Sequence, residues 1–259
     1  MDMTFKEKFL QQWDKHFPGA DLPITFYYTD DPDRAELVAH PEGFRCVIAQ
    51  LGAVRNGKSR SFNAESLGCR GGARYFGFSQ EIMPKFEYFL SCGIPGRLEG
   101  ERYKKSPEIV QEVMKQMPAF KAPARYLVSK RWDQLESEDE PEVIVFFAEP
   151  DVLAGLFTLA NFDDSDLFAV VTPFSAGCGA IVLYPYAEKD ADHPRAVLGM
   201  FDVSARPFVP SNRLTFALPM DKFVRMVDNM DESFLITRAW ERVKTRIEKE
   251  VQPTSKDAE

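Results

Sequence analysis

The longest uninterrupted apolar run in this chain of 259 residues spans only residues 143–148 (VIVFFA). A run of this length is typical of a buried β-strand. It is far shorter than the roughly 20 apolar residues that a helix needs to cross a bilayer. We therefore expect a folded domain built around a strand at 143–148, and no membrane partner.

Apolar spacing and turn residues divide the rest of the chain into further helices and strands. Through the middle of the chain the two kinds of element alternate, which is typical of a sheet with helices packed on it. We predict an α/β or α+β fold: a mixed β-sheet flanked by helices, with a helical pair at the C-terminus. Helices are expected at 4–16, 44–54, 80–91, 106–117, 150–161, 175–184, 221–230 and 232–250, and the other strands at 23–28, 167–174, 197–203 and 213–218.

The length fits one globular domain over residues 1–250. The acidic segment 136–142 is the best candidate for a surface loop or a subdomain seam, and residues 251–259 are expected to be a disordered tail. The charged N-terminus lacks the apolar core of a signal peptide, so we expect a cytoplasmic protein with reduced cysteines. A formal net charge of −8 argues against a nucleic-acid partner.

All four cysteines, Cys46, Cys69, Cys92 and Cys178, lie close to glycine. Glycine lets the backbone turn sharply and approach a ligand closely, so these thiols are candidates for display at a site. None belongs to a C-x-x-C pair, the spacing that makes a zinc or cluster assignment strong. Either the four converge in space on a metal centre, or they are unconnected small residues. Cys92 precedes the sequence GIPG, which also reads as an ordinary helix stop.

The surroundings of the thiols predict their reactivity. Cys46 and Cys178 are expected in the first turns of helices, where backbone amide groups favour a thiolate. Arg45, Arg70 and Arg74 lie near the cysteines in the sequence and are expected to lower the thiol pKa further.

The glycine-rich segment 68–77 reads as a loop or broken strand. It matches neither the P-loop nor the dinucleotide fingerprint. Backbone amides at Gly71 and Gly72, flanked by Arg70 and Arg74, would nevertheless suit an anionic ligand. The alternative is a tight turn with solvated arginines.

Asp202, Ser204 and Arg206 occupy alternate positions of the segment 201–207, which begins within the strand predicted at 197–203. On a strand they would share one face, which lines a pocket or faces solvent. The chain has three histidines, which disfavours a histidine metal site or a Ser-His-Asp triad.

The segments Arg45–Cys46, Cys69-x-Gly-Gly and Cys178–Gly, together with GMFDVSAR at 199–206, resemble the ArCR family, the domain of unknown function 169. The block at 143–150 is similar to the middle of that family. The resemblance covers about residues 5 to 245. It implies a prokaryotic cytosolic protein whose biochemical role is not established, and it supplies no catalytic residues.

The leading hypothesis from the sequence is a metal centre, most naturally an iron–sulfur cluster, held by Cys46, Cys69, Cys178 and Cys92 in a redox or cofactor-linked role. One alternative is a metal-free module that binds a small anionic ligand or nucleotide. Another is an interaction or assembly protein, with a homo-oligomer as one form. The sequence names no reaction and no catalytic residue.

Overall fold

The computed structural model describes residues 3–39, 45–118 and 120–251. A seven-stranded sheet with the order β2-β3-β1-β4-β7-β6-β5 runs through the molecule. Neighbouring strands are antiparallel except for the parallel pair β5 and β6. The strands are β1 (Ile24–Thr29), β2 (Arg60–Phe62), β3 (Tyr126–Arg131), β4 (Val143–Ala148), β5 (Val170–Val171), β6 (Ala196–Gly199) and β7 (Leu214–Pro219).

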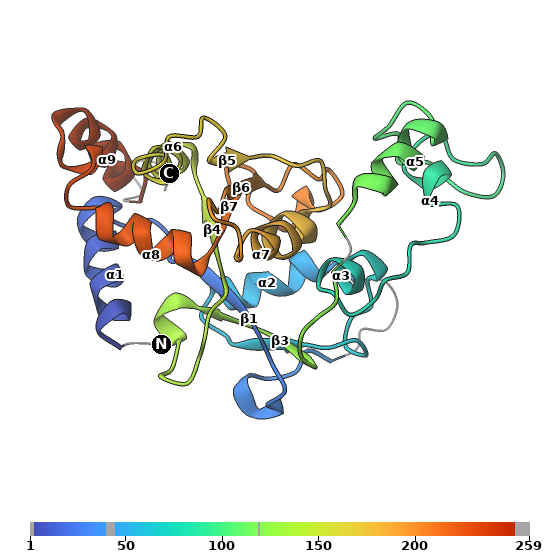
Figure 1. The fold of residues 1–259 in the computed structure, drawn as a ribbon, viewed down its shortest axis with the longest axis horizontal. Helices are drawn as coiled ribbons and strands as arrows, with labels where there is room; N and C mark the ends of the chain where they lie inside the picture. Colours follow the sequence, from blue (N-terminus) through green and yellow to red (C-terminus); the bar gives the residue numbers. More distant parts are fainter. Residues whose placement is uncertain (1–2, 40–44, 119, 252–259) are drawn as a thin grey trace, which may run out of the picture.

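Helices cover the sheet and extend beyond it (Figure 1). This is a mixed sheet flanked by helices in an α+β arrangement with a C-terminal helical pair, so the predicted fold class is confirmed. The α-helices are α1 (Met3–His16), α2 (Val47–Arg55), α3 (Arg70–Tyr75), α4 (Phe86–Phe89), α5 (Pro107–Gln116), α6 (Pro150–Ala160), α7 (Tyr184–Ala187), α8 (Met220–Asn229) and α9 (Arg238–Val251). Short 3-10 turns are η1 (Pro32–Arg34), η2 (Trp132–Gln134), η4 (Arg206–Phe208) and η5 (Phe234–Ile236), and η3 (Gly179–Leu183) is a π-helix.

The apolar run that dominates the sequence forms β4, at the middle of the sheet. Every residue of β4 is buried, because its side chains alternate between two covered faces. Ile144 and Phe146 join one hydrophobic core, and Val143 and Val145 join the other. The sequence prediction of a buried strand at 143–148 is confirmed.

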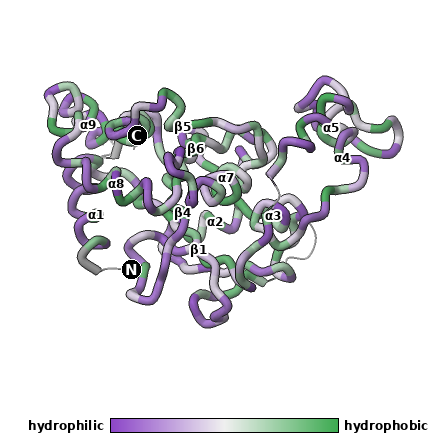
Figure 2. The backbone as a smooth tube through the Cα atoms, viewed as in Figure 1, coloured by the Kyte–Doolittle hydropathy of each residue, from purple (hydrophilic) through white to green (hydrophobic). Residues whose placement is uncertain are grey.

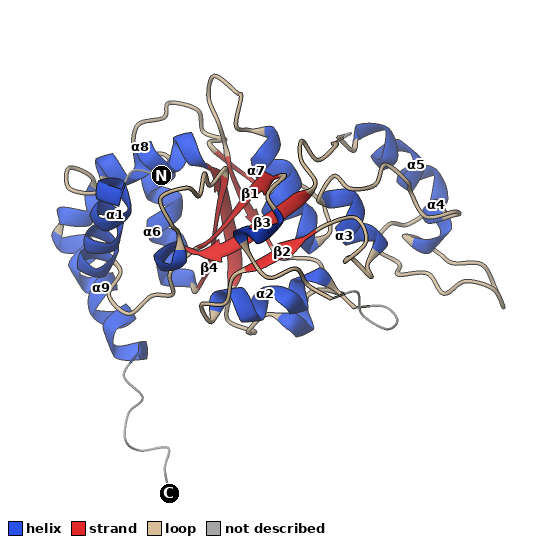
Figure 3. Ribbon diagram, turned by 90° about the horizontal axis from the view of Figure 1, so that it is seen from below, coloured by secondary structure: helices blue, strands red, loops and turns tan. Residues whose placement is uncertain are grey.

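The first face of the sheet is covered by α1, α6, α8 and α9, which Figure 3 shows gathered on one side of the strands. These helices are amphipathic, and the mixed hydrophobic and hydrophilic stretches of α8 and α9 are visible in Figure 2. Phe223, Met226 and Val227 of α8 point into a core rich in aromatic rings.

The second face is covered by α2, α3, η3 and α7. Its core contains fewer buried aromatic rings than the first, and it includes Cys178 and the partly buried Cys46. This face is the one that positions the candidate site.

Residues 79–118, with residues 120 and 121, form an arm that carries α4 and α5 away from the sheet, at the right of Figure 1. At its neck the amide of Ala122 donates to the carbonyl of Gly77 at 2.8 Å. Gly77 has a φ of +79°, and a Cβ there would lie 2.5 Å from the Ala122 nitrogen, so the two ends of the arm can close only with glycine. Helix α5 matches the prediction at 106–117, whereas the helix predicted at 80–91 shrinks to α4.

Several boundaries differ from the sequence predictions. The strand predicted at 167–174 contributes only β5, and the helix predicted at 175–184 is a π-helix followed by α7. The acidic segment 136–142 is a loop between strands of one sheet, and its Asp139 is fully buried against Lys130, at 2.9 Å. Residue 44 and the predicted tail beyond residue 251 lie outside the described residues.

Within the described residues, no helix combines the length and apolar character needed to cross a bilayer.

Candidate functional site

Two of the four cysteines stand at the starts of helices. Cys46 is the residue before α2 and Cys69 the residue before α3, and both have extended backbone angles. The Cys69 sulfur accepts a hydrogen bond from the Gly72 amide at 3.4 Å, so this thiol caps its own helix. Cys46 was predicted in the first turn of a helix, and it lies one residue before that turn.

The glycine-rich segment is not the loop or broken strand that its composition predicted. Residues 70–75 form α3, because a helix here brings Gly72 directly against α2. A Cβ on Gly72 would lie 3.2 Å from Val47 Cγ1, so this contact favours a residue without a side chain. Gly72 thus serves close packing between the two helices that begin after Cys46 and Cys69.

Cys178 lies at the start of the π-helix η3 and is 6% exposed. Gly179, the next residue, packs against the ring of Tyr75 at the end of α3, where a Cβ would lie 2.8 Å from the ring. π-helical turns are rare and occur frequently at functional sites. On the second face of the sheet the starts of α2 and α3 therefore lie against each other, and the start of η3 lies against the end of α3.

Asp202 links the turn at 200–206 to the residues just before Cys178. Its Oδ2 accepts from the Gly177 amide at 3.0 Å, and its Oδ1 accepts from the Ser204 amide at 3.0 Å and the Ser204 hydroxyl at 2.7 Å. The predicted strand 197–203 ends at Gly199, so Asp202, Ser204 and Arg206 do not share a strand face, and that prediction is wrong. The side-chain hydrogen bonds of Asp202 explain the difference, because they favour a turn over a strand ladder.

Met200 is the residue of this region that sequence reasoning missed. It has a left-handed φ of +69° and is 1% exposed. A Cβ on Gly177 would lie 3.0 Å from its sulfur. A buried residue other than glycine with such a φ is uncommon, and such positions cluster at functional sites. Its only sequence signal is its place beside Gly199 in the segment 199–206.

The thiols of Cys46 and Cys69 lie close enough to Cys178 to influence its ionisation. Burial raises the pKa of the Cys178 thiol well above its usual value, and Cys69, Cys46 and Asp202 raise it further. Burial also raises the pKa of Cys46, against the backbone amides of Ile48 and Ala49. The sequence predicted lowered thiol pKa values. For these two cysteines the prediction is wrong, because desolvation outweighs the amide groups of the helix start.

Cys92 lies elsewhere. It follows α4 in the arm and is exposed, and its thiol donates to the Gly93 carbonyl at 3.4 Å. The four cysteines are all free. Among the residues that the structure describes, no three or more His, Cys, Asp or Glu side chains are grouped so that they could hold a metal ion.

The arginines proposed for an anionic ligand have separate surroundings. Arg74 donates to the Gln80 carbonyl at 2.8 Å. Arg206 donates to the carbonyls of Arg213, Ser211 and Pro210 at 2.5, 2.8 and 3.2 Å, and so closes its own loop. Arg70 is exposed and lines a shallow hollow with Ser79, Glu81 and Met83.

The arm reaches the rim of this region. Lys104 Nζ stands 3.7 Å from the centre of the Phe174 ring, and Tyr103 is hydrogen-bonded to Ser204. Phe174, Phe201 and Val203 are more than half exposed, at 51%, 53% and 68%. The thiols are therefore bordered by exposed apolar side chains and by the arm.

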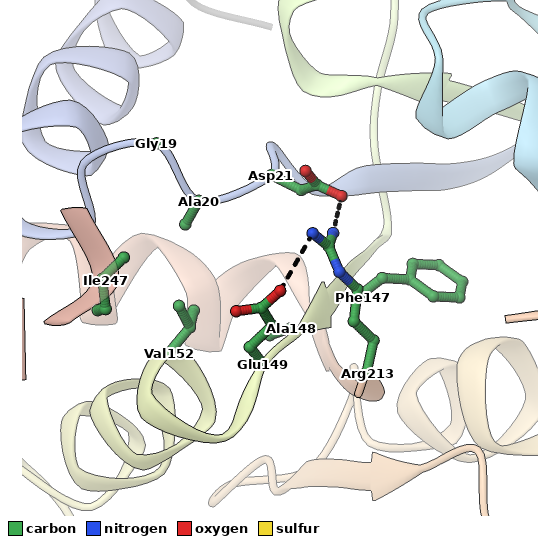
Figure 4. Close-up of a pocket in the computed structure, with 9 residues that line it drawn as sticks. All are labelled: Gly19, Ala20, Asp21, Phe147, Ala148, Glu149, Val152, Arg213 and Ile247. Carbon is green, nitrogen blue, oxygen red and sulfur yellow. Dashed lines mark hydrogen bonds and ion pairs between the residues drawn. The ribbon is translucent and has the colours of Figure 1, made fainter. Parts of the chain in front are cut away.

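A second hollow lies at the ends of β4 and β7, where Arg213 stands between Asp21 and Glu149 (Figure 4). Arg213 forms an ion pair with Asp21, and its guanidinium lies 3.5 Å from Glu149. Arg55 adds a contact to Asp21 at 3.2 Å. Because these charges are matched within the protein, the hollow offers a ligand little to bind.

Neither the curated proteins nor the solved structures contain a match to this chain. A family model, described as uncharacterised ArCR, matches residues 21–229, which includes Cys46, Cys69, Cys178 and the turn at 200–206. Since the match covers most of the chain, this protein belongs to the family of uncharacterised ArCR proteins.

Proposed function

We propose that this protein binds an iron–sulfur cluster through Cys46, Cys69 and Cys178 and serves a redox or cofactor-linked role. One observation carries the proposal: Cys46 and Cys69 begin two helices that pack together, and both thiols lie near enough to Cys178, at the start of η3, to raise its pKa. Thiolates are the protein ligands of iron–sulfur clusters.

We propose a cluster, and not a single ion, as the centre that these three thiols hold. In the described residues no group is tight enough to hold one ion. A cluster is larger than one ion, so its cysteine ligands stand further apart around it. Gly72, Gly177 and Gly179 let the segments at the candidate site pack closely, since a Cβ on each would lie 3.2 Å or less from a neighbouring side chain.

Binding would replace the thiol protons. Cys46 and Cys178 lie in surroundings that disfavour an isolated thiolate, since burial raises the pKa of both. A cationic iron centre supplies the charge that stabilises these thiolates. The bound cluster would supply one-electron chemistry, with a potential set by burial and by hydrogen bonds to its sulfurs.

The test is anaerobic reconstitution of the full chain with ferrous iron, sulfide and a reductant. We expect a brown protein with broad visible absorption and matching iron and acid-labile sulfide. Cys46→Ala, Cys69→Ala and Cys178→Ala should each lose most of the bound iron. Cys92→Ala should retain it, because Cys92 lies in the arm.

Circular dichroism of each variant before reconstitution separates loss of metal from loss of fold. A folded wild-type chain that stays colourless, without iron or sulfide, would contradict the proposal. So would a Cys92→Ala variant that loses as much iron as the other three.

A further inference from the structure

The sheet ends at β5, and this edge differs from the opposite one. Within the described part of the chain β5 pairs only with β6. At the other edge β2 is bordered by a further bridge, between Leu37 and Ser61. An unpaired strand edge is a template for pairing with another chain. The β5 edge is therefore the place where this sheet can receive one.

The turn just before β5 presents large apolar side chains to solvent among acidic ones. Leu167 is 88% exposed and Phe168 is 69% exposed. Residues 163–168, which we call the acidic turn, contain three aspartates and no basic residue. Asp166 also accepts a hydrogen bond from the Phe168 amide at 2.9 Å, which fixes this presentation. The neighbouring Arg195 does not neutralise the turn, because another carboxylate holds its guanidinium at 2.5 Å.

The surface at the other end of β5 is apolar and basic. Phe174, three residues beyond the strand, is 51% exposed, and Phe201 and Val203 are 53% and 68% exposed. The arm borders these side chains, since Lys104 Nζ lies 3.7 Å from the centre of the Phe174 ring. We call Phe174, Phe201, Val203 and residues 102–105 the basic rim.

The positive charges of the basic rim have no partner within the described residues. None of the ion pairs there includes Arg102, Lys104 or Lys105. Glu101 is the adjoining carboxylate, so three cations less one anion leave this part of the arm with a net charge of +2. The Lys104 amide donates to the Leu90 carbonyl at 3.1 Å, which fixes the segment to the rest of the arm.

The two surfaces are complementary to each other, and antiparallel strands would bring them together. When two copies of β5 approach across a two-fold axis, the start of each strand lies beside the end of the other. Phe168 and Phe174 are six residues apart, which is about 22 Å at most. A standard interface of about 800 Å² on each partner is wide enough to include both ends.

We propose that this chain forms a two-fold dimer through the β5 edge, in which the acidic turn of each copy packs on the basic rim of its partner. Apolar side chains would meet at the centre of each contact and opposite charges would meet around it, as in stable protein interfaces. Because Phe174 lies four residues before Cys178, the dimer covers the exposed border of the candidate site. The inference does not depend on a metal centre.

The first measurement is sedimentation velocity of the metal-free full chain over a dilution series. A reductant is present, so that the exposed Cys92 cannot link two chains by a disulfide. We expect a species of twice the mass of one chain, which dissociates on dilution. Added salt should weaken the dimer, because the charges around the contact are screened.

Substitutions at the two ends of β5 test the contact. Phe168→Ser and Phe174→Ser should each weaken the dimer about a hundredfold, since each removes a contact twice and each contact is worth about tenfold. Ile236→Ser is the matched apolar control, at a side chain that is 60% exposed outside both surfaces. Lys105→Glu should also weaken the dimer, whereas Lys58→Glu, at an exposed lysine before β2, should not.

An equal mixture of Phe168→Ser and Phe174→Ser tests which surfaces meet. The first variant keeps its basic rim and the second keeps its acidic turn, so a mixed dimer retains one intact contact. It should be about tenfold tighter than the dimer of either variant alone. Circular dichroism of each variant confirms that it is folded.

Three results would overturn the inference. They are a wild-type chain that stays monomeric at every concentration, a dimer that neither phenylalanine substitution weakens, and a mixture that associates no more tightly than its components. The last result would mean that like surfaces pair. Each of these leaves the proposed cluster untouched, because iron binding is measured separately.

Discussion

The two faces of the sheet receive alternate side chains from the same strands, yet they are filled differently. On the first face Phe9, Trp132 and Phe223 form a triangle of rings with centroids 5.0–5.1 Å apart, in edge-to-face contacts. On the second face the helix starts approach through glycines, and Cys46 and Cys178 belong to the core or its border. Large rings fill space rigidly, whereas small residues and thiols leave reactive atoms at a junction.

We infer from this contrast that the first face contributes most to the stability of the fold and that the second face is the one suited to a functional site. β4 contributes side chains to both faces, so the aromatic core on the first face and the core that contains Cys178 on the second share this strand. If this division is correct, changes on the first face should alter stability and leave metal binding intact. Changes at the thiols should do the reverse.

The largest effect is expected from Trp132→Ala on the first face. Trp132 is fully buried, and its indole nitrogen donates to the Lys6 carbonyl at 3.4 Å. Removing the ring should lower the free energy of unfolding by about 3–5 kcal/mol, measured by urea denaturation. Phe157→Ala, at a ring that is 48% exposed, is the control and should cost much less. A folded Trp132→Ala chain that cannot take up iron would break the division between the faces.

A smaller effect is expected where a glycine lets aromatic rings close on each other. A Cβ on Gly155 of α6 would lie 2.5 Å from Trp240 and 2.6 Å from Phe17. Gly155→Ala should therefore destabilise the protein by about 1–3 kcal/mol through overpacking.

Gly52→Ala in α2 is the matched control for Gly155→Ala, because nothing lies within 4 Å of its added Cβ. It should stabilise the protein by about 0.4–1 kcal/mol, since alanine loses less backbone entropy in a helix. Thermal unfolding distinguishes the two signs. Equal destabilisation by both substitutions would show that packing at Gly155 is not the cause.

The thiols of the metal-free chain should differ in their rates of alkylation. Cys92 is exposed, whereas Cys178 is buried and burial raises its pKa. Iodoacetamide at neutral pH should modify Cys92 at least about tenfold faster, equal to about 1.4 kcal/mol of activation free energy. Mass spectrometry of digested samples taken over time gives the order of modification. Fast modification of Cys178 in the folded chain would mean that local unfolding exposes the second face to solvent, which would contradict this prediction.

The sequence predicted the elements that have long, regular patterns. β4 is continuously apolar, and α5 and α8 have clear helical spacing, so local physics alone locates them. It failed where side chains decide the backbone: residues 70–75 are helical because Gly72 packs on Val47, and residues 200–206 turn because of the hydrogen bonds of Asp202.

The sequence predicted which residue types form the candidate site, but only partly which of them lie together in the fold. Equal spacing of Cys46, Cys69 and Cys92 could not show that the third lies in an arm, since that depends on the neck at Gly77. The direction of the thiol pKa values was also wrong for Cys46 and Cys178. Helix starts can be inferred from sequence, but burial is a property of the assembled fold.

The smallest expected effect lies at the edge of the aromatic face, in the pH dependence set by His16. Its side chain is buried, and its Nε2 lies 3.2 Å from Asp231. Burial lowers the pKa of His16 below 6.5. The hydrogen bond to the Asp231 carboxylate opposes this lowering of the pKa, and the nearby charges of Lys15 and Lys244 reinforce it. The unfolded chain therefore binds a proton more readily than the folded protein does. The stability that this group contributes is fully present above pH 6.5 and is lost as the pH falls below that value.

The sign can be checked with His16→Gln, which keeps a polar group beside Asp231 and does not titrate. Urea denaturation between pH 7.5 and 5, about one unit to either side of the ordinary histidine pKa, should show a shallow loss of stability in the wild type and a flatter profile in the variant. Asp231 has a lowered pKa of about 2, so its carboxyl group titrates at a more acidic pH than this experiment covers. A steeper loss in His16→Gln than in the wild type would reverse the sign. It would show that the ion pair with Asp231 outweighs burial, so that this edge of the aromatic face is held by charge and not by packing alone.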